Sequence, residues 1–178
     1  MLVIGLGKGG CNVAKLFKKH KNYQVVMLDE GKGIPKKETV EEYDDFVYKP
    51  PKTWLTKHSE ALVILSGCGK IAGSTLRVLE PLKALKTTVC YMIPELDYLS
   101  SEAKLRHKVH FNVLQEFTRS GMIDELILFD NELTLEHFGH GPIKDYYNIV
   151  NHYYYSCLHM NNYCKNVTPI FGEHHTPK

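Results

Sequence analysis

The sequence lacks both a long apolar run and a large excess of one charge. Among its 178 residues, 22 Lys and Arg face 20 Asp and Glu, which gives a formal net charge of +2. A membrane-spanning helix needs about 20 apolar residues in a row, and nucleic-acid binders usually concentrate basic charge on one face. We therefore expect no membrane and no nucleic acid among the partners of this chain, and proteins instead.

A disulfide framework is also missing. The five cysteines are odd in number and irregularly spaced, and the short apolar stretch at residues 2–4 runs into glycines instead of forming a signal peptide. Free thiols and a cytoplasmic location are the prediction. The histidines and cysteines form no compact ligand pattern for a metal, and no side chain sits in a recognisable nucleophile context. No metal site and no catalytic residues are therefore predicted.

Short apolar runs alternate with helical patterns along the chain. Strands are predicted at residues 2–4, 24–28, 61–65, 88–93 and 126–129, and helices at 11–20, 76–85, 100–120, 132–138 and from 142 onward. Residues 31–52 are polar and contain prolines, so little regular structure is expected there. This alternation predicts an α/β fold, with a Rossmann-like, mostly parallel sheet and helices on both faces. One domain would span residues 1–165, and residues 166–178 would form a short tail.

Two of the predicted strands end in glycine-rich loops that lead into helices. The first loop covers residues 5–10 and the second covers residues 66–75. Glycines let the backbone approach an anion, and the helix N-terminus supplies N–H donors. Two such loops at neighbouring strand ends would hold a di- or triphosphate from both sides of a topological switch point.

The first loop has a dinucleotide interpretation. Gly5-x-Gly7-x-x-Gly10 matches the dinucleotide fingerprint, and Asp29 follows the second strand, where it is placed to bond a ribose hydroxyl. On this interpretation the chain is a small NAD(P)-binding Rossmann oxidoreductase or sensor. The second loop is then left without a role.

A longer set of motifs resembles the nucleotide-binding domain of the tubulin and FtsZ superfamily. Residues 5–14 resemble its opening loop, and residues 67–74 occupy the place of its signature glycine loop. Asn131, after the strand at 126–129, sits where the family has an Asn that reads the guanine edge. Tyr147 and Asn151 share one face of the last helix, where the family has an aromatic that stacks on the base and an Asn that bonds it.

The resemblance implies GTP or GDP as the ligand, with Mg²⁺, and assembly with copies of itself or with other subunits. It places the acidic Asp29 near the phosphates or their metal. The nucleotide-binding residues that it implies are Gly7, Lys8, Gly9, Gly10, Cys11, Asn12, Asp29, Gly69, Lys70, Ala72, Gly73, Ser74, Asn131, Tyr147 and Asn151.

The sequence also departs from the family pattern. Lys70, Ile71, Ala72 and Thr75 replace residues of the signature loop, and the tail offers no carboxylate before Glu173. We therefore expect a GTPase at most, with weak or no hydrolysis, and only the nucleotide-binding half of the family's architecture. The alternative is a tubulin-like structural protein that has lost nucleotide, as part of a viral or plasmid-encoded assembly. Its pocket would be blocked by Lys8, Lys70 or Ile71.

Overall fold

The computed structural model describes residues 1–37, 39, 41–138 and 143–167. The strands in this part of the chain are β1 (Leu2–Leu6), β2 (Gln24–Glu30), β3 (Gly33–Ile34), β4 (Glu60–Leu65), β5 (Lys86–Ile93) and β6 (Glu125–Asp130). The α-helices are α1 (Gly7–Leu16), α2 (Lys52–Lys57), α3 (Thr75–Leu79), α4 (Ser101–Arg119), α5 (Asn131–Phe138) and α6 (Ile143–Asn166). The 3₁₀ turns are η1 (Phe17–Lys19), η2 (Glu41–Tyr43), η3 (Lys70–Ser74), η4 (Glu80–Ala84) and η5 (Leu96–Tyr98).

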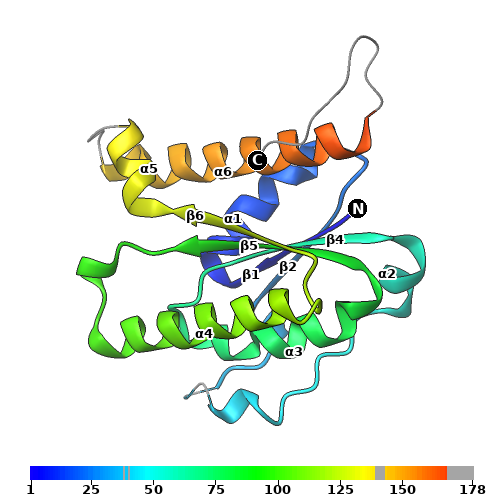
Figure 1. The fold of residues 1–178 in the computed structure, drawn as a ribbon, viewed down its shortest axis with the longest axis horizontal. Helices are drawn as coiled ribbons and strands as arrows, with labels where there is room; N and C mark the ends of the chain where they lie inside the picture. The colour runs from blue at the N-terminus through cyan, green and yellow to red at the C-terminus, as the bar shows by residue number, and fades with distance from the viewer. Residues whose placement is uncertain (38, 40, 139–142, 168–178) are drawn as a thin grey trace.

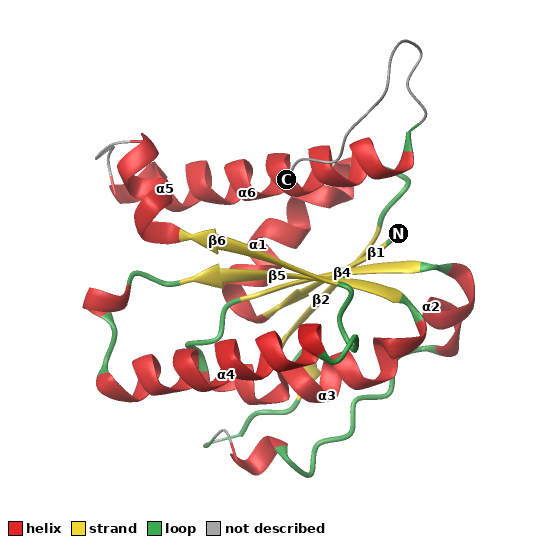
Figure 2. Ribbon diagram, viewed as in Figure 1, coloured by secondary structure: helices red, strands yellow, loops and turns green. Residues whose placement is uncertain are grey.

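The described strands form one parallel sheet in the order β3-β2-β1-β4-β5-β6. Figure 2 shows it as a twisted layer between two layers of helices. The chain starts at β1, adds β2 and β3 on one side, and returns to add β4, β5 and β6 on the other. The topological switch point therefore lies between β1 and β4, and the loops after these two strands are neighbours.

Helices cover both faces of the sheet. α1, α5 and α6 lie on one side, and α3 and α4 lie on the other (Figure 1). Alternate residues of the buried strands enter different cores: Ile4 packs with the α3 and α4 side, whereas Val3 packs with α1 and α6. The alternation follows from the period of two in a strand, and burial on both faces explains the continuous apolar runs in β1 and β4.

The α/β prediction is confirmed, and the sheet is parallel throughout its described strands. Pro81 stands at the start of η4, where the α-helix after the second glycine loop has already ended. One boundary was wrong. The first helix begins at Gly7 and not at residue 11, because the glycine loop itself forms its first turn. The core side of α4 carries Leu114 and His110.

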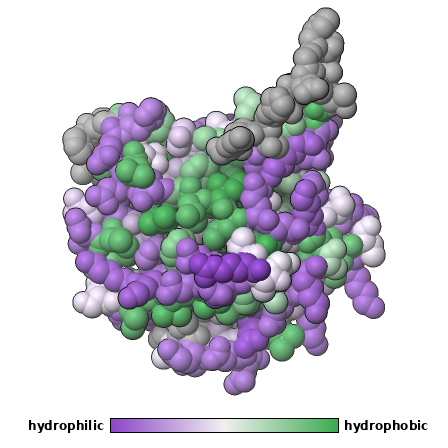
Figure 3. Space-filling model, viewed as in Figure 1, coloured by the Kyte–Doolittle hydropathy of each residue, from purple (hydrophilic) through white to green (hydrophobic). Residues whose placement is uncertain are grey.

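The edge strand β6 and the outer face of α6 leave apolar side chains exposed. Leu128 of β6 is 45% exposed, and Met160 of α6 is 58% exposed. Figure 3 shows apolar surface gathered between these two elements. No helix in the described part of the chain is long and apolar enough to cross a membrane.

Polar and aromatic side chains join α6 to the segment between α1 and β2. His20 Nε2 lies 2.6 Å from the Tyr155 hydroxyl, and His159 Nδ1 lies 2.8 Å from the Tyr23 hydroxyl. Asn162 Nδ2 donates to the same Tyr23 oxygen at 2.7 Å. The rings of His20 and His159 stack at 4.3 Å. The nearby His20 disfavours protonation of His159.

Burial lowers the pKa of His159 from its ordinary value of 6.5, and the nearby His20 lowers it further. Burial also lowers the pKa of His107, which lies 2.8 Å from the Tyr91 hydroxyl. A histidine whose pKa is lower in the folded state binds protons more readily when unfolded. We therefore expect the free energy of unfolding to fall as the pH drops below about 6.5.

Urea denaturation from about pH 8 to about pH 5, a range that brackets a histidine pKa of about 6.5, measures how the free energy of unfolding depends on pH. His159→Gln should flatten the profile, whereas the same change at His152, which is exposed on α6, should leave it unaltered. An unfolding free energy that rises on acidification would contradict the assignment.

Candidate functional site

A cleft of about 560 Å³ lies at the carboxyl ends of the strands. Its walls come from the loops after β1 and β4, from the segments after β5 and β6, and from α6. Its volume is in the range of small-ligand sites. The lining residues are Leu6, Gly7, Lys8, Gly9, Ser66, Cys68, Gly69, Ile71, Met92, Pro94, Glu95, Tyr98, Leu99, Asn131, Tyr147, Val150, Asn151 and Tyr154.

The first glycine loop opens α1 toward this cleft. Gly7 has φ = +73°, a conformation that glycine adopts without strain, and α1 begins at this residue without a side-chain cap. The N–H groups of a first helical turn have no partner within the helix. Lys8 and Gly9 are exposed and line the cleft, so this end of the helix suits an anion.

Gly10 packs α1 against the sheet, and its contact with a nucleotide stays a prediction. It is buried and does not line the cleft, and a Cβ at this position would lie 2.0 Å from the carbonyl oxygen of Ile64. The absence of a side chain lets α1 lie directly on β4. This contact fixes the first loop beside the second.

In the second loop, Gly69 and Ile71 line the cleft, whereas the residues after Ile71 do not. Ala72 and Ser74 are buried, and the Ser74 hydroxyl donates to the Ile71 carbonyl at 2.7 Å. Lys70 is exposed and lines a neighbouring hollow beside Arg106. Gly73 is partly buried within η3 and is not among the lining residues.

Ile71 stands between the two loops. Its Cγ2 methyl is 3.2 Å from where a Cβ of Gly7 would be, and 3.9 Å from the equivalent point at Gly69. Its side chain is half-buried and packs against the core on the α3 side. An apolar group therefore narrows the end of the cleft that both glycine loops face.

The three residues that the resemblance assigns to the guanine base line the other part of the cleft. Asn131 is the first residue of α5, directly after β6, and Tyr147 and Asn151 come from α6. Tyr147 is 61% exposed, so its ring is open to a stacking partner. The structure thus brings together side chains that are distant in sequence.

Buried Tyr154 orients the side chain of Asn131. Its hydroxyl donates to Asn131 Oδ1 at 2.7 Å, and its ring stacks on Phe129 at 4.3 Å. Asn131 does not cap α5, because Asp130 Oδ1 accepts from the N–H groups of Glu132 and Leu133 at 2.9 and 3.2 Å. Asn131 is therefore held by a side-chain contact instead of serving as the cap.

Asp29, Cys11 and Asn12 are not among the lining residues. Asp29 Oδ1 accepts from the N–H of the next residue at 2.9 Å. The Cys11 thiol lies 3.4 Å from the carbonyl oxygen of Gly5, behind the loop, and burial with the nearby Asp29 raises its pKa to about 11. Asn12 is exposed on α1.

Sequence reasoning missed the contribution of the segment after β5, which includes Pro94, Glu95 and Tyr98. The signal was present, because residues that follow a strand of a parallel sheet meet at one edge. Glu95 Oε1 accepts from the Tyr146 hydroxyl at 3.1 Å. Burial raises the pKa of Tyr146, and the nearby Glu95 charge raises it further.

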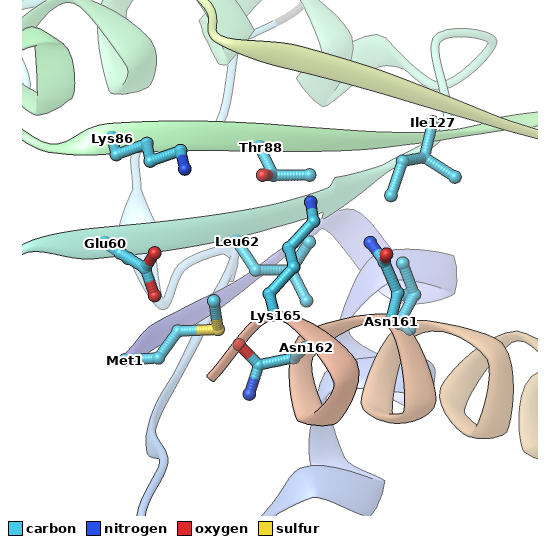
Figure 4. Close-up of a pocket in the computed structure, with 10 residues that line it drawn as sticks. Met1, Glu60, Leu62, Lys86, Thr88, Ile127, Asn161, Asn162 and Lys165 are labelled. Carbon is cyan, nitrogen blue, oxygen red and sulfur yellow. The ribbon is translucent and has the colours of Figure 1, made fainter. Parts of the chain in front are cut away.

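A small cavity lies at the opposite end of the sheet. Its volume of about 20 Å³ suits a single water molecule, and in Figure 4 Lys165 reaches from α6 toward the strands beside it. The Lys165 ammonium donates to Glu125, so this corner serves to fasten α6 to β6. No group of three or more His, Cys, Asp or Glu side chains is placed to hold a metal within the described residues.

Comparison with solved structures identifies the type of fold. An empty FtsZ dimer from M. jannaschii matches with a TM-score of 0.68 and 16% sequence identity, over 96% of this chain. The fold is tubulin/FtsZ-like. No family model and no curated protein sequence matches.

The match to FtsZ covers 56% of the FtsZ chain, so the present chain spans little more than half of that protein's length. At this identity the likeness to FtsZ is one of fold. The cleft lies where open α/β sheets bind ligands, outside the carboxyl ends of the strands at the switch point.

The contact of Gly10 with β4 predicts a large loss of stability for Gly10→Ala. The new methyl group would meet a backbone carbonyl that has no room to move, so we expect a loss of about 3 kcal/mol or more in the free energy of unfolding. Urea denaturation measures it. Gly69→Ala is the matched control, since the nearest side-chain atom is 3.9 Å away. Equal losses in the two variants would contradict the structural role of Gly10.

Proposed function

We propose that the cleft binds a guanine nucleotide and that the chain acts in self-assembly or as one subunit of a larger protein assembly. The observation that supports this most strongly is the lining of the cleft. Two glycine loops form one part, and Asn131, Tyr147 and Asn151 form another. Guanine presents both donors and acceptors, and amide side chains complement both.

The charges of the cleft suit a nucleotide held mainly by backbone N–H groups. Lys8 is the one cation among the lining residues, and Glu95 is the one carboxylate. Mg²⁺ keeps several waters and is usually held by phosphates with one or two carboxylates. Glu95 would be its protein partner, and the ion would supply charge neutralisation at the phosphates.

Hydrolysis is proposed to be weak or absent. A hydrolytic site needs a residue that positions the attacking water. The single lining carboxylate, Glu95, already accepts the Tyr146 hydroxyl. Within the part of the chain that the structure describes, no second carboxylate reaches the cleft.

Ile71 favours a second candidate, a tubulin-like structural protein that has lost nucleotide. Its Cγ2 methyl lies 3.2 Å from the Cβ position of Gly7 and 3.9 Å from that of Gly69, so it would compete with phosphates held between the two loops. The dinucleotide interpretation has less support. It depended on Asp29, which is not among the lining residues.

Titration calorimetry with GTP, GDP, ATP and NADH distinguishes the three. For the wild-type chain we expect guanine nucleotides to bind with a Kd on the order of 1 µM or lower. Asn151→Asp should weaken GTP binding about tenfold, because a carboxylate loses the amide donor and adds a negative charge near the ligand. Asn148→Asp is the matched control, since Asn148 is exposed on α6 outside the cleft lining.

The outcomes separate the candidates. Binding of NADH alone supports the oxidoreductase or sensor. Absence of binding to all four ligands supports the structural protein. An unchanged GTP affinity in Asn151→Asp would contradict the assignment of that helix face to the base.

Ile71→Ala tests the narrow end of the cleft. Removing the Cγ and Cδ atoms should tighten GTP binding about tenfold, about 1.4 kcal/mol, and leave guanosine binding unchanged. Leu105→Ala, at an exposed side chain of α4 outside the cleft, is the control. If the affinities for guanosine and GTP increase equally, Ile71 does not act at the phosphates.

A further inference from the structure

The outer face of α6 carries an exposed row of side chains with coiled-coil spacing. We call this row the α6 stripe: Ile149, Tyr153, Ser156, Met160 and Tyr163, at intervals of four, three, four and three residues. Its four large members are between 36% and 58% exposed. α6 already buries its opposite face through Val150, Tyr154 and Leu158. The stripe is therefore a second apolar face, and its spacing suits another helix.

Two hollows flank Tyr153 of the stripe. One is a groove of about 620 Å³ against β6, lined by Ile127, Phe129 and Met160 among others. The other has a volume of about 400 Å³ and lies against α5, where it is lined by Phe138 and Ile149. Tyr153 lines both. Figure 3 shows the apolar surface of the groove between α6 and β6. The stripe thus offers both projecting side chains and holes.

The charge pattern indicates a partner of the same kind. Residues 146–164 contain no Asp, Glu, Lys or Arg, so two copies of α6 meet without like-charge repulsion. A charged partner helix would instead lose hydration without gaining ion pairs. The stripe is also balanced about Ser156, with Ile149 and Tyr163 at equal distances along the sequence.

We propose that the α6 stripe is a self-association surface on which a second copy of this chain docks its own α6, antiparallel, across a two-fold axis at Ser156. The small Ser156 side chain lets the helices approach at the crossing point. Each Tyr163 then faces Ile149 of the other copy, and Tyr153 and Met160 fill the hollows. This contact is isologous and closed. It rests on the self-assembly part of the proposed function and is independent of nucleotide.

Sedimentation equilibrium of the full chain without nucleotide tests the surface. The wild-type protein should dimerise in a concentration-dependent manner at micromolar concentrations. Met160→Glu should raise the dissociation constant at least about tenfold, because the two-fold axis buries the new carboxylate twice. At dilutions where both proteins are monomeric, its thermal unfolding should be unchanged, since Met160 is exposed. Leu105→Glu, at a 62% exposed position of α4 on the other side of the sheet, is the matched control and should dimerise as the wild type does.

Cysteine cross-linking tests the orientation. In a background with Cys157→Ser and Cys164→Ser, the variant Ser156→Cys should form a disulfide-linked dimer under mild oxidation, because the residue faces itself across the axis. Tyr163→Cys alone should not, since its counterpart is Ile149. Rapid cross-linking through Tyr163→Cys would indicate parallel helices and overturn the arrangement.

The remaining outcomes each have one meaning. A dimer that Met160→Glu leaves intact would place self-association on another surface and overturn the inference while sparing the proposed function. A chain that stays monomeric at every concentration would overturn both the inference and the proposal of self-assembly. Nucleotide binding, measured separately, is unaffected by either result.

Discussion

The approach of α1 to β4 is the contact on which the cleft depends. Gly10 lies so close to the Ile64 carbonyl that no side chain fits between them. This closeness sets α1 at the switch point and fixes its first turn relative to the loop after β4. Both glycine loops then face one space, and the strand ends and α6 complete its walls. The lack of a side chain at Gly10 therefore helps to set the geometry of a site assembled from five segments.

Much of the fold follows from the sequence, because its determinants are local. The short apolar runs at residues 2–4 and 61–65 identify β1 and β4. The pairing of Tyr147 with Asn151 follows from helical spacing. The placement of Asp29 and Ile71 does not, because it depends on how distant segments pack. Glycine likewise permits several conformations, so the sequence could not show that Gly10 serves packing while Gly7 faces the cleft.

α6 has three different faces. Val150, Tyr154 and Leu158 pack on the sheet, Tyr147 and Asn151 line the cleft, and the α6 stripe is open to a partner. Consecutive residues of a helix point about 100° apart, so Tyr153 belongs to the stripe, Tyr154 packs on the sheet, and Tyr155 lies against His20. One helix therefore links the core, the candidate ligand site and the proposed interface.

The polar bonds at the carboxyl half of α6 constrain how that helix moves. Asn162 to Tyr23, His159 to Tyr23 and Lys165 to Glu125 each join one specific atom to another. Apolar packing tolerates small axial shifts, but a shift of one residue would rotate each of these polar groups away from its partner. α6 is therefore locked in register at one end. A displacement of the helix at Tyr147 and Asn151 would therefore tilt α6 about its anchored carboxyl half instead of shifting it along its axis.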